Sequence, residues 1–221
     1  MTRASTVAEQ ASGRSSADRA YDVIQERLVM LDIRPGDPIN DDKLGAELGY
    51  GRTPVREALK RLERDRLVIA YPRRGTFATA VDMTDLSSIS EIRRQLEPLA
   101  ADRAARTANA DTRRRLSVLA EEIAEIGDDQ HPKDVLRKDV RVHREIYRAA
   151  GNAHLEDILT CLDAHATRIW CLFIDRLPHV AEHVREHEAL LSAIVDGNAD
   201  TAAELTLAHV DGFENAVRRL L

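Results

Sequence analysis

The feature that most limits the possible folds of this chain is the run of helical patterns that follows Ala80. Apolar side chains recur at three- and four-residue spacing, and the breaks between these segments are short and rich in Gly, Asn and Pro. We expect helices at about 84–107, 112–126, 133–150, 154–176, 179–196 and 199–220. Long helices joined by short breaks favour antiparallel neighbours. The sequence therefore predicts an antiparallel six-helix bundle over residues 86–221, preceded by a linker at 81–85.

Residues 17–80 carry shorter patterns. The spacing of Ala20, Ile24 and Leu28 predicts a first helix, which two prolines end. A second helix is expected at 41–48, and Thr53-Pro54 predicts an N-cap and a first helical residue for a third. Two β-prone runs, 67–71 and 76–80, then flank a turn that contains two arginines. These elements predict a winged helix-turn-helix with a two-stranded wing, and hence a mainly α protein.

Charge is distributed unevenly along the chain. Charged residues make up 32% of it and aromatic residues 4%, a composition typical of helical proteins and poor for an all-β fold. The net charge is −6, yet residues 51–75 hold eight basic and three acidic side chains. A local basic patch on an acidic protein indicates a nucleic-acid-binding module joined to a module of another kind.

The remaining composition bears on the compartment. Cys161 and Cys171 form neither a disulfide framework nor a zinc-binding Cys pattern, which favours a reducing cytoplasm. No run approaches the roughly 18 apolar residues that a membrane span needs, and residues 1–16 lack the apolar core of a signal peptide. We expect a cytoplasmic protein with no membrane partner. Because residues 1–16 are rich in Ser, Ala and Thr, we expect them to be a disordered tail.

The start of the predicted third helix has the chemistry of a DNA-reading element. Arg52 and Arg56 are four residues apart, so both can face a major groove and contact guanine in a fork geometry. Thr53 and the helix N-terminus can hold a phosphate. In the wing, Arg73, Arg74 and Gly75 are expected to reach the neighbouring groove or phosphates. A solvated charge run without function is the alternative, which the placement at a helix start and a wing tip disfavours.

Residues 20–79 resemble the GntR superfamily of bacterial transcription regulators. The resemblance is carried by Pro35-Gly36, Leu44 to Gly49, Arg52 to Leu59 and Gly75-Thr76-Phe77. Gly51 stands where the family usually has Ser, and Arg66 where Gly is common. The resemblance implies a winged-helix head that binds double-stranded DNA at a palindromic operator as a homodimer.

Polar residues interrupt the apolar seams of three predicted bundle helices. His143, His187 and His209 lie in the middle of such seams, and Asp139 lies one turn before His143. A single inward histidine is more often a hydrogen-bonded core residue than a ligand. Three of them with a carboxylate favour a divalent cation, because the cation pairs the buried carboxylate and accepts neutral imidazole nitrogens.

The bundle resembles the FCD effector domain of the FadR branch of GntR regulators, in its shorter, VanR-like subgroup. The matching pieces are Glu91 to Glu97, Asp139 to His143, Gly151-Asn152, His187 to Ile194 and His209. The resemblance implies a metal held by Asp139, His143, His187 and His209. The ligand chemistry makes Zn, Ni or Mn the expected ions, because imidazole suits the first two and a carboxylate with open positions also admits Mn. It also implies a small organic acid as the effector that docks on the metal.

Four further residues are candidates for the lining of the expected pocket. Arg93 can turn inward from the first bundle helix and grip a carboxylate, or it can form a structural salt bridge. Asn152 is an effector-binding candidate, with helix capping as the alternative. His165 lies on an apolar seam and His183 lies one turn before His187, so either could compete as a ligand.

Three functions fit these observations. The first is a transcription regulator, without enzyme activity, whose operator binding responds to a carboxylate metabolite at the metal site. The second is a metal-sensing regulator with no organic effector. The third is a metal-dependent hydrolase, which the missing HExxH pattern and the complete DNA-reading head disfavour.

Overall fold

The structure, a computed structural model, describes residues 14–177 and 179–220. The chain divides between Ala80 and Val81 into two compact units, and each unit is described here by itself. The tail expected to be disordered falls mainly on residues 1–13, which lie outside the described residues. At its end, Ser15 caps the helix that begins at Ser16 in a reciprocal capping box with Asp18, so these two residues belong to the helix and not to the expected tail.

In its described residues, from 14 onward, the N-terminal unit has three helices and a small sheet. Its elements are α2 (Ser16–Val29), β1 (Pro38–Ile39), α3 (Asp41–Leu48), α4 (Arg52–Arg64), β2 (Val68–Tyr71) and β3 (Gly75–Ala78). Helices α2 and α4 pack together through their apolar faces. Ala20, Ile24 and Leu28 are fully buried on one face, and so are Val55, Ala58 and Leu62 on the other. The predicted apolar periodicity is therefore confirmed for both helices.

The predicted two-stranded wing is present as β2 and β3, and a third strand joins it, so the sheet has the order β1-β3-β2. The short strand β1 pairs antiparallel with β3, with Pro38 opposite Phe77 and Ile39 opposite Thr76. A strand of two residues is too short to show an alternating pattern in the sequence. Pro38 is tolerated there because β1 is an edge strand, where a missing N–H costs little.

Glycine is required at two positions in and just after α3. Gly49 ends α3 in the left-handed region, with φ 72°. A Cβ at Gly45 would lie 2.8 Å from the backbone oxygen of Tyr50, which is too close for any side chain. Arg66 also lies in the left-handed region, with φ 60°, a conformation that glycine adopts more readily than arginine.

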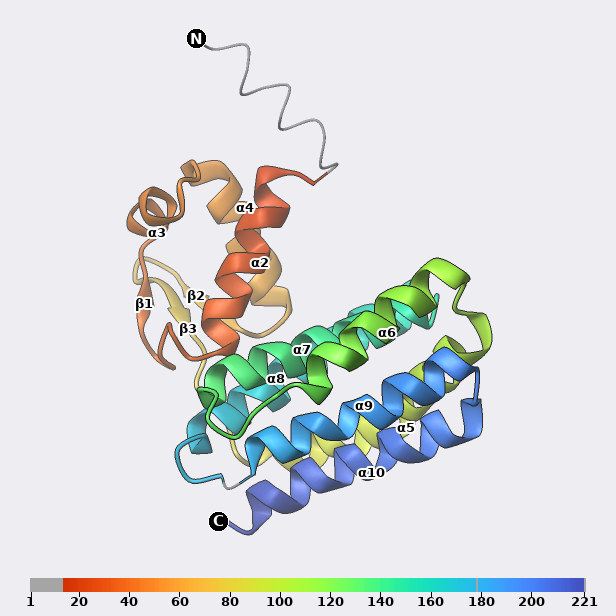
Figure 1. Cartoon of the computed structure of the whole chain (residues 1–221). Helices are drawn as coiled ribbons and strands as arrows, with labels where there is room; N and C mark the ends of the chain where they lie inside the picture. The colour runs from red at the N-terminus through yellow and green to blue at the C-terminus, as the bar shows by residue number, and fades with distance from the viewer. Residues whose placement is uncertain (1–13, 178, 221) are drawn as a thin grey trace. The chain divides into compact units, whose positions relative to one another are not determined.

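The C-terminal unit is the predicted antiparallel bundle (Figure 1). Its helices are α5 (Asp85–Thr107), α6 (Ala110–Ala124), α7 (Pro132–Ala149), α8 (Ala153–Phe173), α9 (Val180–Asp196) and α10 (Ala199–Arg218). Helix α5 packs against α7, α8, α9 and α10, whereas α6 covers α9. The bundle interior therefore lies where α5, α7, α8, α9 and α10 meet.

One arginine joins three helices of the bundle through backbone carbonyls. Arg113 on α6 donates to the carbonyl oxygens of Ala105 (2.7 Å), Ala108 (3.0 Å) and Ile194 (3.0 Å), and also to that of Val195. The last carbonyls of a helix have no partner within the helix. Arg113 therefore satisfies the C-terminal ends of α5 and α9 together.

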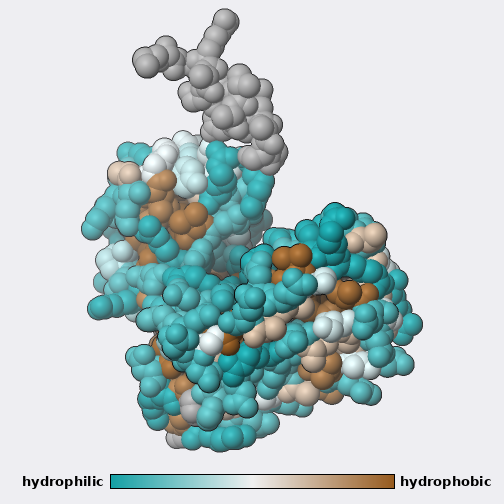
Figure 2. Space-filling view, viewed as in Figure 1, coloured by the Kyte–Doolittle hydropathy of each residue, from teal (hydrophilic) through white to brown (hydrophobic). Residues whose placement is uncertain are grey.

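The surface is mainly polar. On the face shown in Figure 2, hydrophilic residues cover most of the surface of each unit, and small apolar patches lie among these residues. Exposed large apolar side chains include Ile92 and Leu99 on α5 and Ile158 and Leu172 on α8. Among the described residues, no helix combines the length and the apolar character needed to cross a membrane.

Candidate metal centre and DNA-reading surface

The DNA-reading candidates of α4 lie in its first turn, with one correction to the predicted cap. The N-cap is Gly51 rather than Thr53, and it provides no side-chain hydrogen bond. Arg52 is therefore the first helical residue, and Pro54 falls within the first turn, where its missing N–H breaks no helical hydrogen bond. Without a capping side chain, the N–H groups at this helix start stay open to an anion such as a phosphate.

Both candidate arginines, Arg52 and Arg56, are exposed and paired with acidic residues at the start of α3. Nε of Arg56 lies 2.5 Å from Oδ2 of Asp41, and Arg52 forms an ion pair with Asp42. The hydrogen bond from Arg56 lowers the pKa of Asp41, so this carboxylate stays ionised at neutral pH. The two guanidinium groups are therefore held by neighbouring aspartates at the start of α3.

The wing candidates lie together at the tip of the hairpin. Arg73, Arg74 and Gly75 are exposed, and Arg74 N–H donates to the carbonyl of Tyr71 at 3.1 Å. Arg73 has φ 64° and Gly75 has φ 95°, so a left-handed position lies on each side of Arg74. This tight turn presents both guanidinium groups to solvent.

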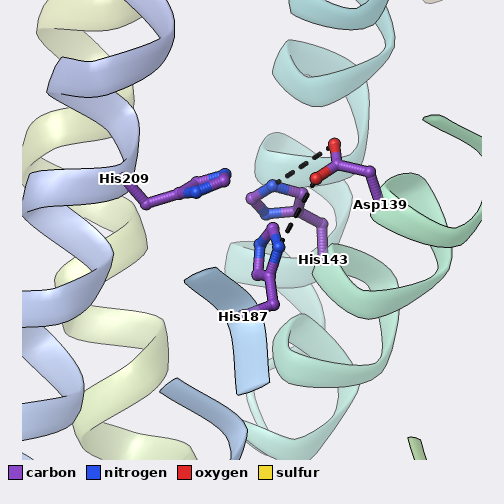
Figure 3. Close-up of side chains that lie close together, drawn as sticks. All are labelled: Asp139, His143, His187 and His209. Atoms are coloured by element: carbon purple, nitrogen blue, oxygen red, sulfur yellow. Dashed lines mark ion pairs between the residues drawn. The ribbon is translucent and has the colours of Figure 1, made fainter. Parts of the chain in front are cut away.

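The four predicted metal ligands converge inside the bundle. Asp139 and His143 lie on α7, His187 on α9 and His209 on α10, and all four are buried. One donor atom from each lies within 4.8 Å of the others. Figure 3 shows the carboxylate of Asp139 directed at the rings of His143 and His187. The predicted inward direction of these side chains is confirmed, because the apolar neighbours on each seam bury that whole helix face.

Each imidazole has its Nδ1 atom next to an acceptor. Nδ1 of His187 lies 3.1 Å from the carbonyl of Val184, and Nδ1 of His209 lies 3.1 Å from Oε2 of Glu186. Nδ1 of His143 lies 3.2 Å from the hydroxyl of Tyr147. A proton on Nδ1 leaves Nε2 with a free lone pair, the arrangement found in histidines that bind metals.

The electrostatics keep the histidines neutral. Burial lowers the pKa of His187 to about 3 and lowers the pKa values of His143 and His209 well below their usual range. Burial also raises the pKa of Asp139 well above its usual range. Neutral imidazoles are the form that coordinates a cation, and the charge of Arg93 offsets only part of the cost of burying the Asp139 carboxylate.

Two orphaned atoms show that a cation fits this set. Within the described residues, Oδ1 of Asp139 and Nε2 of His187 are buried without a hydrogen-bond partner. Such atoms cost free energy unless something coordinates them. A divalent cation would satisfy both, so the donor set suits one. Three nitrogens and one carboxylate leave further coordination positions open, because zinc, nickel and manganese accept five or six ligands.

A narrow cavity adjoins the donors and contains Arg93. It is lined by Arg93, Leu136, Asp139, His143, Asp163, Ala166, Thr167, Trp170, His183, His209 and Phe213. It has room for about one water molecule. Arg93 is buried and pairs with Glu97 one turn away. Arg93 therefore lines the cavity and also forms a salt bridge, so it combines the two placements that the sequence left open.

The sequence reasoning missed several residues around this cavity. Glu97, Asp163 and Thr167 are buried, and burial raises the pKa of Asp163 to about 7. Glu186, which holds His209, was also missed. Asp163 did carry a signal, because it follows Leu159 by four residues on the buried face of α8, as His143 follows Asp139 on α7. Glu97 could have been found from its i,i+4 spacing to Arg93.

The remaining candidates are placed as follows. The Oδ1 atom of Asn152 accepts a hydrogen bond from the N–H of Leu155 at 3.3 Å and caps α8, and Asn152 does not line the cavity. His165 is half-buried and does not line it either. His183 does line it, and its ring stacks on that of His209 with 4.0 Å between centroids.

Comparison with protein families identifies both units. Residues 16–78 match the family described as bacterial regulatory proteins, gntR family, and residues 88–212 match the FCD domain. The second match alone covers more than half of the chain. The first match ends just before the boundary between the two compact units, and the second begins after it.

Individual relatives agree with this assignment. The HTH-type transcriptional regulator YdhC of Bacillus subtilis is 28% identical, with 86% of this chain and 85% of the relative covered. The Nta operon transcriptional regulator of Aminobacter aminovorans is 29% identical, with 82% and 85% covered. The fold is similar to that of McbR/YncC from E. coli, with a TM-score of 0.81, 18% identity and 94% and 99% of the chains covered. The chain therefore belongs to the GntR family of bacterial regulatory proteins and is a transcriptional regulator with an FCD domain.

Proposed function

We propose that this regulator binds a palindromic operator as a cytoplasmic homodimer, and that a small organic acid bound at a metal site in the FCD domain modulates that binding. The observation that carries the proposal is the convergence of Asp139, His143, His187 and His209 beside a cavity that contains Arg93. A cation supplies a Lewis-acidic docking point there, and a carboxylate is the group that both a cation and a guanidinium attract.

DNA recognition is assigned to α4 and the wing. Arg52 and Arg56 would contact base edges, while Thr53, Arg73, Arg74 and Gly75 would contact the backbone or the adjacent groove. Dimerisation is supported by exposed apolar side chains seven residues apart on α5, namely Ile92 and Leu99. Zinc, nickel and manganese are the proposed ions, because imidazole suits the first two and a carboxylate with open positions admits the third.

Arg93 has a defined task in this scheme. Although burial opposes its charge, Glu97 and Asp163 raise the pKa of Arg93, so it stays cationic inside the bundle. An incoming carboxylate would share this guanidinium with Glu97 and take its second contact from the cation. Asn152 remains a weaker candidate for effector contact, because its side chain already caps α8.

One observation favours a second candidate, a metal-sensing regulator with no organic effector. The cavity admits about one water molecule, and Arg93 is already paired. In that case, the cation itself would tie α7, α9 and α10 together and alter DNA binding. The organic-acid function requires side chains of the cavity wall to move when the acid binds.

The two candidates are separated by operator titrations. DNA selected from random sequence by the protein is labelled, and its binding is measured for metal-free protein, zinc-loaded protein, and zinc-loaded protein with a panel of small carboxylates. The organic-acid function predicts that one acid shifts the affinity of zinc-loaded protein and has no effect after chelation. Metal sensing predicts that zinc alone gives the full shift. A protein whose operator affinity responds to neither would exclude both.

The DNA-reading assignment has its own test. Arg52→Ala and Arg56→Ala should each weaken binding to the selected site by roughly 1–3 kcal/mol per half-site. Arg73→Ala should mainly reduce the salt dependence. Arg114→Ala removes one exposed charge from the bundle and serves as the control. If both α4 variants bind like the control at matched salt, α4 is not the recognition helix.

A further inference from the structure

A second donor cluster lies on the solvent side of the proposed metal site. It consists of His183 and Glu186 on α9 and His209 on α10, with donor atoms within 4.8 Å of one another. Oε2 of Glu186 lies 3.2 Å from Nδ1 of His183 and 3.1 Å from Nδ1 of His209. Ligands that share a tetrahedral zinc ion at 2.0–2.2 Å have about this separation. The three atoms are therefore spaced to share one cation.

Exposure falls steadily from this outer cluster to the inner one. The side chain of Glu186 is 51% exposed, that of His183 is 13% exposed, and that of His209 is 4% exposed. The side chain of His187, in the inner cluster, is fully buried. His183, His209, Asp139 and His143 all line the same narrow cavity. This cavity therefore connects the outer cluster to the inner donors, and potential ligands line it.

His209 is common to both clusters but can serve only one at a time. A neutral imidazole carries one proton, on either Nδ1 or Nε2. With a cation on Nδ1 at the outer cluster, the proton sits on Nε2. When the cation binds Nε2 at the inner cluster, the proton returns to Nδ1, which donates to Glu186. No proton is gained or lost by the ring, so the transfer is balanced.

The ring of His183 is held in place for this role. It lies between His209, on which it stacks, and Trp170, whose ring centroid is 4.7 Å away. The inner set of Asp139, His143, His187 and His209 has its four donors without it. His183 is therefore positioned to contact a passing cation without being needed for the final site.

We propose that His183 and Glu186 form an outer cation site that captures a divalent ion from solvent and passes it through His209 to the inner site. This inference rests on the proposed inner metal site. An outer site on the path lowers the barrier in both directions. Its loss should therefore slow uptake and release by the same factor and leave the equilibrium affinity unchanged.

The test uses His183→Phe, which keeps an aromatic ring between His209 and Trp170 but removes the donor nitrogen. Metal-free full-length protein is mixed with Co²⁺, and the visible absorption of the bound ion is followed in time. Release is followed after addition of excess chelator, and affinity is measured by chelator competition. We expect uptake and release both to slow by roughly tenfold, equivalent to ~1.4 kcal/mol in the barrier.

A second variant and a control complete the design. Glu186→Gln should also slow uptake, whereas His179→Ala, an exposed histidine one turn before His183, should load at the wild-type rate. If His183→Phe loads Co²⁺ as fast as wild type, the outer site is not on the path. If it instead releases the ion faster and binds it more weakly, His183 is a ligand of the final site. If wild-type protein binds no Co²⁺, the inner site itself is wrong.

Discussion

Oδ1 of Asp139 on α7 lies 3.5 Å from Nδ1 of His187 on α9, although 48 residues separate them in the chain. Neither this contact nor any other described one gives Oδ1 of Asp139 a hydrogen bond. A buried carboxylate in this position costs free energy unless a cation compensates it. The stability of the bundle therefore depends on whether a cation occupies the space beside Asp139 and His187.

Metal content gives the first prediction. His187→Ala removes a donor from the centre of the inner cluster, so purified protein should lose most of its divalent metal. His165→Ala, which changes a histidine outside the cavity, should retain about one ion per chain. Elemental analysis of both variants beside wild type measures this. Full metal content in His187→Ala, or loss in His165→Ala, would place the site elsewhere.

The second prediction concerns pH. Burial lowers the pKa values of His143, His187 and His209 in the folded state, to about 3 for His187. Below their ordinary pKa of about 6.5, the unfolded chain binds more protons than the folded one, so stability falls as pH falls. Each pKa unit corresponds to ~1.4 kcal/mol. The three histidines should therefore remove unfolding free energy from the metal-free protein as pH falls from 7 to 4.

Urea unfolding at a series of pH values measures this loss. Asp139 and Asp163 act in the opposite direction, because their raised pKa values give stability at low pH that is lost as pH rises through those values. His187→Gln, whose side chain does not titrate, should show a shallower acid loss than wild type. His154→Gln, at an exposed position on α8, should show the wild-type slope. Equal slopes in all three proteins would contradict a neutral buried His187.

Arg113 provides a stability prediction independent of the metal. Arg113→Ala removes the donors to carbonyls at the ends of α5 and α9, so the unfolding free energy should fall by about 1.5–3 kcal/mol. Arg114→Ala next to it removes only an exposed pair with Asp111 and should change stability by less than ~0.5 kcal/mol. Calorimetry on the two variants compares them. Equal stability would mean that these carbonyls are satisfied by water.

The last prediction separates the two roles of Arg93. Arg93→Ala leaves Glu97 buried beside no cation and should destabilise the protein by about 3–5 kcal/mol. Changing both residues to glutamine removes both charges, so it should cost less. Both forms should still bind operator DNA without effector but should lose the response to the cognate acid. If the double variant keeps the full response, Arg93 is structural only.

The sequence by itself determined which faces of the helices are buried. Apolar residues at three- and four-residue spacing predicted the six helices and placed His143, His187 and His209 inside, because periodicity fixes the direction of a side chain relative to its helix axis. The same local information located Arg52 and Arg56 at a helix start. It misplaced the cap of α4 by two residues, because Gly51 caps without a side chain.

Only the tertiary structure decided which inward residues meet. Distances between helices depend on how they pack, and packing depends on side chains far apart in sequence. It brought Glu186 to His209, paired Arg93 with Glu97 while keeping it in the cavity, placed His183 on the rim and left His165 outside. It also added β1 to the wing, since a two-residue strand is specified by its partner β3 and not by its own pattern.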